Sequence, residues 1–501
     1  MAEPKTQAAA APAPEAPSTE AEAGAGLFDQ ILQESRIGRT EEGRSRARDL
    51  VGELVQEVMD GTITVKRDVI QAIEQRIADI DALLSDQISA IMHHEDFQQM
   101  ESSWRGLEYF VFNSETSVNL KIKMLPVSKR ELVRDMKNSS EFDQTALFKK
   151  IYEEEYGTFG GAPFAAMVGD YEFTNHPEDL YLLEQMGHIA AASHAPFLTA
   201  SSPELFKFDS FTELSKPRDL AKIFDTVEYA KWKSFRESDD SRYVGLALPR
   251  VLSRLPYGEA TSPVDDFAFE ERVDGKEHDR YLWMNAAYAL GTRLTDAFAR
   301  YGWCAAIRGV EGGGLVEGLP THTFPTDDGD VALKCPTEIA ITDRREKELA
   351  DLGFIPLVHC KGTDYAAFFS TQSAQKPKKY DKDQATANSR LSTQLQYIMA
   401  VSRIAHYLKS MMRDKIGSFQ SRGQVEKYLN DWLAQYVLLD DMAGQEAKAA
   451  KPLREARVEV VEVPDKPGAY KAVAFLRPHF QLEELTVSLR LVADLPQAAA
   501  R

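Results

Sequence analysis

Apolar residues recur every three or four positions along much of the N-terminal quarter of the chain, which is the spacing of an amphipathic helix. Residues 26–38 form a short predicted helix that Gly38 ends. Its apolar face consists of Leu27, Phe28, Ile31 and Leu32. Because amphipathicity does not name a partner, this helix can dock either on its own domain or on the surface of another protein.

A second, longer apolar stripe follows and extends over about six helical turns. It consists of Ile70, Ile73, Ile77, Ile80, Leu84, Ile88 and Ile91. The stripe lacks the run of clean heptads that a coiled coil requires. We therefore expect this long helix to face the core of its own domain.

Alternating apolar and polar residues predict strands on both sides of the middle of the chain. Residues 118–125 alternate in this way, as do three C-terminal segments at 458–463, 472–476 and 485–492. The last of these has one apolar face, made of Val487, Leu489 and Leu491. A terminal strand of this kind either completes its own sheet, which is the default expectation, or adds to the edge of a neighbour's sheet.

Together these patterns predict an α+β fold (mixed α/β) with five segments. Residues 1–25 contain 10 Ala, 4 Pro and 4 Glu and form a predicted disordered tail that tethers the short helix at 26–38. Residues 44–135 form a helical and strand part, and residues 136–385 mix helices with short apolar runs, as α/β domains do. Residues 386–501 hold a long helix that is locally basic, followed by the β-rich end of the chain.

Composition excludes several classes of protein. The 501 residues carry 59 Lys and Arg against 78 Asp and Glu, a net charge of -19, which argues against nucleic-acid or anionic-membrane binding. No apolar run reaches the ~18 residues of a membrane span, and the N-terminus lacks the order of a signal peptide. Three cysteines without C-x-x-C spacing favour buried structural thiols in a reducing compartment. These features predict a soluble cytoplasmic protein without membrane insertion.

Signatures of catalysis are missing from the sequence. It holds no phosphate-binding loop with its lysine, no H-E-x-x-H helix and no G-x-S-x-G elbow. The glycine-rich residues 309–318 are interpreted as a loop that needs positive φ, and the adjacent His93 and His94 as surface or capping residues. We therefore expect no cofactor and no metal, and an enzyme only if folding builds a cleft.

Five segments carry a resemblance to a known family, and together they are specific. They are residues 97–107 (FQQMESSWRGL), 160–164 (GGAPF), 308–314 (RGVEGGG), 402–407 (SRIAHY) and 475–480 (FLRPHF). The chain resembles the large subunit of the contractile sheath of bacterial type VI secretion systems (the TssC/VipB family) over residues 27–496. The resemblance implies a structural protein without enzymatic activity. Such a protein pairs with a smaller sheath subunit, stacks with other copies into a helical tube around an inner tube protein and above baseplate components, and contracts to propel the inner tube.

The resemblance also implies two kinds of site. Exchange of terminal strands between protomers would make the C-terminal strands interlock elements, which reverses the default given above. The residues concerned are Val458, Val460, Val461, Val463, Val487, Leu489 and Leu491. An AAA+ unfoldase that recycles contracted sheath would bind the tethered helix through Leu27, Phe28, Ile31, Leu32, Arg36 and Ile37.

Two alternatives remain open. An adaptor or scaffold for an AAA+ unfoldase would keep the tethered helix but remain a small soluble oligomer. A hydrolase would need a cleft lined by convergent titratable groups, for instance around residues 312–314.

Overall fold

The computed structural model describes Ser45 and residues 69–481, apart from 266, 274, 276, 327–328, 419–420 and 464–468. The chain divides into two compact units, Met1–Leu84 and Ser85–Arg501. Helix α3 (Val69–Met92) begins in the first unit and ends in the second. All other named elements lie in the second unit.

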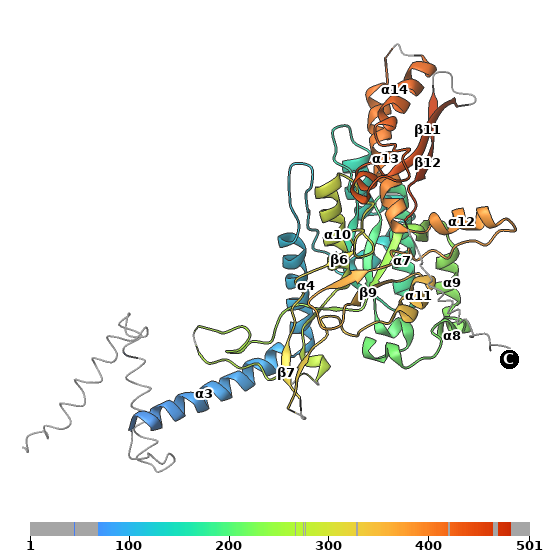
Figure 1. Cartoon of the computed structure of the whole chain (residues 1–501). Coiled ribbons are helices and arrows are strands. Elements are labelled where there is room, and N and C mark those ends of the chain that lie inside the picture. Colours follow the sequence, from blue (N-terminus) through green and yellow to red (C-terminus); the bar gives the residue numbers. More distant parts are fainter. Residues whose placement is uncertain are drawn as a thin grey trace, which may run out of the picture. The chain divides into compact units, whose positions relative to one another are not determined.

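A six-stranded mixed sheet lies at the centre of the second unit, with strand order β1-β2-β3-β9-β10-β6 (Figure 1). Its strands are β1 (Met167–Phe173), β2 (Phe197–Ser201), β3 (Val244–Leu248), β9 (Ile355–His359), β10 (Ala366–Phe368) and β6 (Leu315–Val316). The first four run parallel, and β10 is antiparallel to both of its neighbours. Strands β2 and β3 are buried along their whole length, as expected for parallel strands covered on both faces.

Helices cover both faces of this sheet. Val244, Leu246 and Leu248 of β3 belong to the same core as helix α7 (Pro177–Ser193). Ala247 of the same strand belongs to the core of α10 (Ala286–Tyr301) and of the start of α13 (Leu395–Asp414). Because successive side chains of a strand point to opposite faces, α7 and α10 lie on opposite sides of the sheet. The centre of the unit is therefore a three-layer α/β arrangement.

Helix α4 (Glu95–Phe112) packs closely on α10 through a glycine from each helix. Gly106 of α4 faces the ring of Tyr288, and Gly291 of α10 faces the ring of Phe110. A Cβ atom added at Gly106 would lie 2.4 Å from the Tyr288 ring. The missing side chains at these two positions allow the helices to approach, and this approach positions α4.

A third core builds a C-terminal module on helices α13 and α14 (Arg422–Ala434). Strands β11 (Leu453–Glu462) and β12 (Tyr470–Pro478) form an antiparallel hairpin that packs on α14 (Figure 1). The buried residues of this core are Trp303, Ile404, Leu408, Leu429, Leu433, Leu453, Val458 and Val460. We call these two helices and the hairpin the C-terminal module.

Short elements complete the described chain. The remaining α-helices are α5 (Lys129–Asn138), α6 (Ala146–Phe148), α8 (Ala221–Phe224), α9 (Ala230–Glu237), α11 (Asp343–Asp351), α12 (Asp383–Leu391) and α15 (Gln445–Ala450). A π-helix, η3, spans Lys149–Tyr156, and 3₁₀ turns span Phe142–Gln144, Pro203–Phe206, Phe211–Ser215, Val227–Tyr229, Asp240–Tyr243 and His278–Arg280. Two further strand pairs are β4 (Val251–Leu252) with β5 (Trp283–Met284), and β7 (Thr323–Pro325) with β8 (Val331–Leu333).

Several sequence predictions are confirmed. The fold is mixed α and β, and the segments at 458–463 and 472–476 coincide with β11 and β12. His94 caps α4 by accepting a hydrogen bond from the backbone N–H of Asp96. Within residues 309–318, the glycines with positive φ are Gly309, Gly313 and Gly318.

Other predictions are wrong. Residues 118–125 do not form a strand, because they pair with no described strand. The apolar stripe of α3 does not face a core, because Ile73, Ile77, Ile80, Leu84 and Ile91 are exposed. The long basic helix is two helices, because the chain leaves the helical path after Leu391 so that Thr393 can pair with Ser373. Cys360 is exposed rather than buried.

Three predicted segments lie outside the described residues. They are the tail at 1–25, the helix at 26–38 and the strand at 485–492.

The glycine contact between α4 and α10 leads to a test of stability. We expect Gly106→Ala to lower the free energy of unfolding by about 1–3 kcal/mol, because overpacking against Tyr288 outweighs the gain in helix propensity of about 1 kcal/mol. Gly423→Ala in α14 is the matched control, since a Cβ there meets no atom within 4 Å. Urea unfolding of the purified chain measures both variants, and equal stability of the two would contradict the assignment.

Candidate assembly interfaces

Side chains of α14 cover the outer edge of β11. The amide of Asn430 donates to the carbonyl of Val458 (2.8 Å) and accepts from its N–H (2.9 Å). Glu426 accepts a hydrogen bond from the N–H of Val460 at 3.0 Å. These side chains satisfy backbone groups that a third strand would otherwise pair, so β11 is closed on this side.

The register of the hairpin then defines which groups of β12 are open. Val458 pairs with Ala474, and both backbone groups of Val458 point away from β12 toward α14. In an antiparallel pair the opposite residue points outward as well, so the N–H and C=O of Ala474 face away from β11. Among the described strands β12 pairs with β11 alone. Its outer edge can therefore accept a further strand.

The structure separates the C-terminal residues that the sequence grouped together. Val458 and Val460 are fully buried in the core of the C-terminal module, whereas the side chain of Val461 is exposed. Val463 follows the end of β11 and donates to the carbonyl of Ala469. Val487, Leu489 and Leu491, like the six residues of the predicted unfoldase-binding helix, lie outside the described residues.

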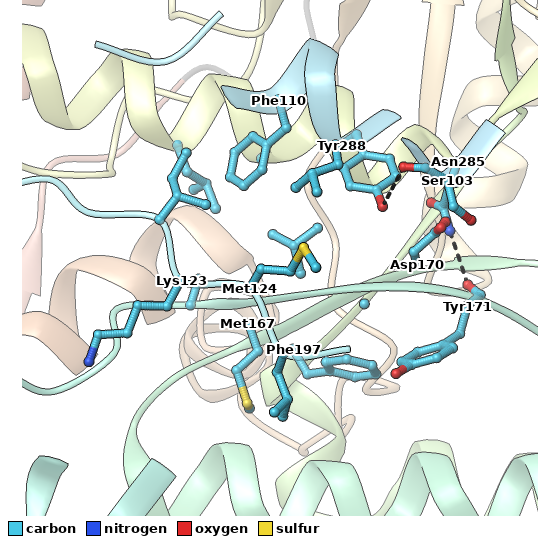
Figure 2. Close-up of a pocket in the computed structure, with 18 of the residues that line it drawn as sticks. Ser103, Phe110, Lys123, Met124, Met167, Asp170, Tyr171, Phe197, Asn285 and Tyr288 are labelled. Atoms are coloured by element: carbon cyan, nitrogen blue, oxygen red, sulfur yellow. Dashed lines mark hydrogen bonds between the residues drawn. The ribbon is translucent and has the colours of Figure 1, made fainter. Parts of the chain in front are cut away.

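A cavity of about 1350 Å³ opens beside the central sheet (Figure 2). Residues from α4, β1, β2 and α10 line it, together with the extended segment at 118–128. Its apolar wall includes Phe110, Met124, Met167 and Phe197. A cavity of this size with an apolar wall can hold several side chains of a partner protein.

Polar groups form the other wall of the cavity and bond to one another. Asn285 donates to the carbonyl of Tyr171 at 3.1 Å, and the hydroxyl of Tyr288 donates to the carbonyl of Ser103 at 3.4 Å (Figure 2). Burial raises the pKa of Asp170, and hydrogen bonds from Ser103, Tyr288 and Asn285 only partly oppose this shift. Burial likewise raises the pKa of Tyr171 to about 12.

The segment at 118–125 lies at the rim of this cavity and exposes apolar side chains. Val118 is 86% exposed, and Met124 and Leu125 are exposed as well. Its backbone belongs to no described strand, although its alternating pattern is that of a strand. Tyr171 fixes the end of the segment by donating to the carbonyl of Val127 at 2.7 Å. The segment is thus held beside the sheet without being paired along its length.

Helix α4 presents a large aromatic side chain next to this segment. Trp104 is 61% exposed and lines the cavity. Met100, one turn earlier, and Phe112, at the end of the helix, are also exposed. Exposed apolar residues of this size are typical of protein–protein interfaces, where tryptophan is enriched among the residues that contribute most of the affinity.

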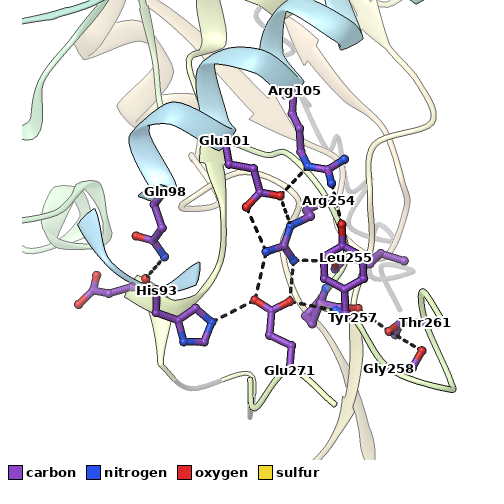
Figure 3. A network of polar contacts seen from close by, with 12 residues as sticks. His93, Gln98, Glu101, Arg105, Arg254, Leu255, Tyr257, Gly258, Thr261 and Glu271 are labelled. Carbon is purple, nitrogen blue, oxygen red and sulfur yellow. Dashed lines mark hydrogen bonds and ion pairs between the residues drawn. The ribbon is translucent and has the colours of Figure 1, made fainter. Parts of the chain in front are cut away.

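A network of largely buried charges fixes α4 through Glu101 and Arg105 (Figure 3). The guanidinium of Arg254 donates to Glu101 at 2.8 Å and to Glu271 at 2.6 Å. Arg105 donates to Glu101 at 2.7 Å and to the hydroxyl of Tyr257 at 2.8 Å. The network joins the helix to the loop at 254–271, so α4 is a fixed platform for its exposed side.

The network has a defined dependence on pH. Burial alone would raise the pKa of Glu101, but hydrogen bonds from Arg254 and Arg105 outweigh it and hold the pKa below its ordinary value of 4.5. The stabilisation is therefore fully present above pH 4.5 and is lost as the pH falls through the lower pKa of the folded state.

The glycine-rich loop gives no support to a hydrolase. Gly309 donates to the carbonyl of Phe368, and a Cβ at Gly313 would lie 2.2 Å from the carbonyl oxygen of Ala306. Gly309 therefore packs its backbone on β10, and Gly313 packs closely on the backbone of Ala306. The loop does not line the cavity. No group of three or more His, Cys, Asp or Glu side chains that could hold a metal occurs in the described part of the chain.

Sequence reasoning missed most of these features. The cavity and the Arg254 network join residues that lie more than 150 positions apart, such as Glu101 and Arg254 (153 positions), and no local pattern connects them. The sequence did contain one indication of an interface. Residues 118–125 have the pattern of a strand, and no described strand pairs with them.

Comparison with known proteins points to one family. The sequence matches the family described as "EvpB/VC_A0108, tail sheath N-terminal domain" over residues 74–375, and its "tail sheath gpW/gp25-like domain" over residues 384–495. It is 52% identical over 474 residues to the Type VI secretion system sheath protein TssC1 of Pseudomonas aeruginosa. That alignment covers 94% of this chain and 95% of that protein.

Solved structures of contractile systems show a weaker likeness. A chain of the anti-feeding prophage baseplate is 10% identical with a TM-score of 0.35, and the match covers 63% of this chain and 66% of that one. A chain of the PVC sheath complex of an extracellular contractile injection system in the contracted state is 9% identical with a TM-score of 0.33, and covers 62% and 68%. Likeness at this level supports no conclusion about function.

None of the described helices combines the length and the apolar character needed to cross a membrane.

The Arg254 network predicts a strong effect of a single charge. Glu271 is 1% exposed, so Arg254→Met would leave a buried carboxylate without its main partner. We expect this variant to lose about 3–5 kcal/mol of stability in urea unfolding at neutral pH. Arg280→Met, which removes an exposed ion pair with Glu277, should cost no more than about 1 kcal/mol. Similar losses in the two variants would contradict the role assigned to the network.

Proposed function

The chain belongs to the EvpB/VC_A0108 tail sheath family, and from this membership we propose how its open surfaces serve an assembled sheath. It is a structural subunit of the contractile sheath of a type VI secretion system. We propose further that it pairs with a smaller sheath subunit, and that the pairs polymerise with other copies around an inner tube protein above baseplate components. The assembled sheath contracts and propels the inner tube. The subunit acts in the cytoplasm and without catalysis.

The surface proposed for the smaller sheath subunit is formed by residues 118–125, the cavity and the exposed face of α4. The observation that carries this proposal is the unpaired segment at 118–125, which has the pattern of a strand and exposes its apolar residues. A strand from the partner would pair its backbone, and apolar side chains of the partner would enter the cavity. Trp104 and Met124 would be covered in the same step.

Substitution of Val118 tests this surface. We expect Val118→Asp to weaken co-purification with the smaller subunit by at least about tenfold, because a buried and unpaired carboxylate opposes binding. Val227→Asp is the matched control, since Val227 is 90% exposed and lies far along the chain in a 3₁₀ turn. Affinity chromatography after co-expression measures both variants, with circular dichroism to confirm folding. If Val118→Asp retains as much of the smaller subunit as Val227→Asp does, this surface is not the binding site.

The proposed contact between neighbouring protomers uses the outer edge of β12. Residues 485–492 of one protomer, with Val487, Leu489 and Leu491 on their apolar face, would add to β12 of the next. Val458 and Val460 support this contact from within, because they anchor β11 to α14 and so hold β12 in place. Main-chain pairing of this kind gives affinity that depends little on the side chains of the incoming strand.

Substitution of Ala474 by proline tests the outer edge of β12 without disturbing the hairpin. The N–H of Ala474 faces away from β11 by the register, so Ala474→Pro removes a donor for the incoming strand and leaves the β11–β12 ladder intact. We expect no sheath tubules from this variant in electron micrographs after co-expression with the smaller subunit. Deletion of residues from 485 onward should have the same effect, and Ala474→Ser, which keeps the N–H, should form tubules. Normal tubules from Ala474→Pro would contradict strand addition at this edge.

The tethered helix at 26–38 is proposed as the recognition element of an AAA+ recycling unfoldase. Its contact residues are Leu27, Phe28, Ile31, Leu32, Arg36 and Ile37. A single short helix binds weakly, but its repetition along a polymer raises the apparent affinity for the assembled sheath over that for the free subunit.

A further inference from the structure

Two residues outside the proposed interfaces form a close thiol–imidazole pair. Cys335 follows β8, and His359 is the last residue of β9. The Sγ atom of Cys335 lies 3.3 Å from Nδ1 of His359 and 3.2 Å from Oγ1 of Thr337. The thiol therefore has a nitrogen base and a hydroxyl within hydrogen-bonding reach.

A second contact determines which nitrogen of His359 carries the proton. Nε2 lies 2.8 Å from the carbonyl oxygen of Thr363. A carbonyl oxygen only accepts hydrogen bonds, so Nε2 must carry the hydrogen of the neutral ring. Nδ1 is then the acceptor and faces the thiol of Cys335. This arrangement allows the thiol proton to pass to Nδ1, which leaves a thiolate beside an imidazolium.

The surroundings of Cys335 and Cys304 shift the pKa values of the two thiols in opposite directions. Burial alone would raise the pKa of Cys335, but hydrogen bonds to His359 and Thr337 outweigh it and lower the pKa below the ordinary 9.0. Burial alone would lower the pKa of His359, but Cys335 and the Thr363 carbonyl raise it. The thiol of Cys304 instead donates to the carbonyl of Leu294 at 3.5 Å, and burial raises its pKa to about 12.

We propose that Cys335 is a site of oxidation by hydrogen peroxide, with His359 as the group that takes the thiol proton and returns it to the leaving oxygen. The thiolate attacks one peroxide oxygen, so that a sulfur–oxygen bond forms and the oxygen–oxygen bond breaks. The sulfur loses two electrons and becomes a sulfenic acid. The departing hydroxide takes the proton from the imidazolium, which gives water and neutral His359.

Solvent accessibility and thiol reactivity predict different orders of oxidation for Cys335 and Cys360. Cys335 is only half-buried, so a small peroxide can reach it, but Cys360 is the exposed cysteine. If exposure controlled the rate, Cys360 would be oxidised first. If the imidazole controls it, Cys335 is oxidised first.

The experiment exposes the full-length protein to hydrogen peroxide in the presence of dimedone, which traps sulfenic acids, and follows each cysteine by peptide mass spectrometry. We expect Cys335 to be labelled about tenfold faster than Cys360 or more, and Cys304 to remain unlabelled. Labelling of Cys360 at the same rate as Cys335, or faster, would overturn the proposal.

A variant isolates the contribution of the imidazole. His359→Gln should lower the labelling rate of Cys335 by about tenfold and leave the rate of Cys360 unchanged. An unchanged rate at Cys335 would overturn the role of His359. Cys304 reports on folding in the same digest, because it becomes labelled if the variant unfolds. In that case the order in which the three cysteines of the unaltered protein are labelled decides whether Cys335 is the site of oxidation.

Discussion

Every backbone N–H and C=O that leaves water needs a hydrogen-bond partner, and this requirement determines which surfaces of the chain are closed and which are open. At β11 the requirement is met within the chain, because Asn430 and Glu426 of α14 bond the groups that face away from β12. At the outer edge of β12 and along residues 118–125 no described strand meets it. Helices cover both faces of the central sheet, whereas the edge of β12 and the segment at 118–125 are suited to pairing with a second polypeptide. An assembling subunit needs this combination of a closed core and open edges.

The features that the sequence predicted are those that local patterns encode. Alternation at 458–463 and 472–476 marks β11 and β12, because a strand with one buried face must alternate. The same pattern at 118–125 predicts a strand, but the structure shows no described strand paired with it. Alternation can be read from one segment, whereas pairing depends on a second segment that the pattern does not identify. The break between α12 and α13 could not be predicted from the sequence either, because it depends on a backbone hydrogen bond between Ser373 and the distant Thr393. The Arg254 network joins Glu101 and Glu271, and no spacing rule relates residues so distant in sequence.

Contacts in the interior hold helix α4 in place and thereby position its exposed side chains. Gly106 allows close approach to α10, and Arg254 ties Glu101 to the loop at 254–271, so the buried side of the helix is fixed by packing and by charge. Trp104 lies on the exposed side of the same helix. A side chain on a helix held in this way loses little conformational freedom when a partner covers it, and more of the contact energy appears as affinity. The glycine and the buried charges are therefore part of the proposed interface, although neither touches the partner.

Helix α13 connects the central sheet to the C-terminal module as one continuous element. Its first residues, including Leu395 and Ile398, belong to the core beneath the sheet, and Ile404 and Leu408 belong to the core of the module. Arg413, near its end, donates to the carbonyl groups at the end of the π-helix η3. A force applied at the edge of β12 would pass through β11 and α14 to α13, and from there to the sheet. Because tightly packed elements rotate as rigid bodies rather than deform, strand pairing at β12 would couple the rotation of one subunit to that of the next, and a contracting sheath requires this coupling.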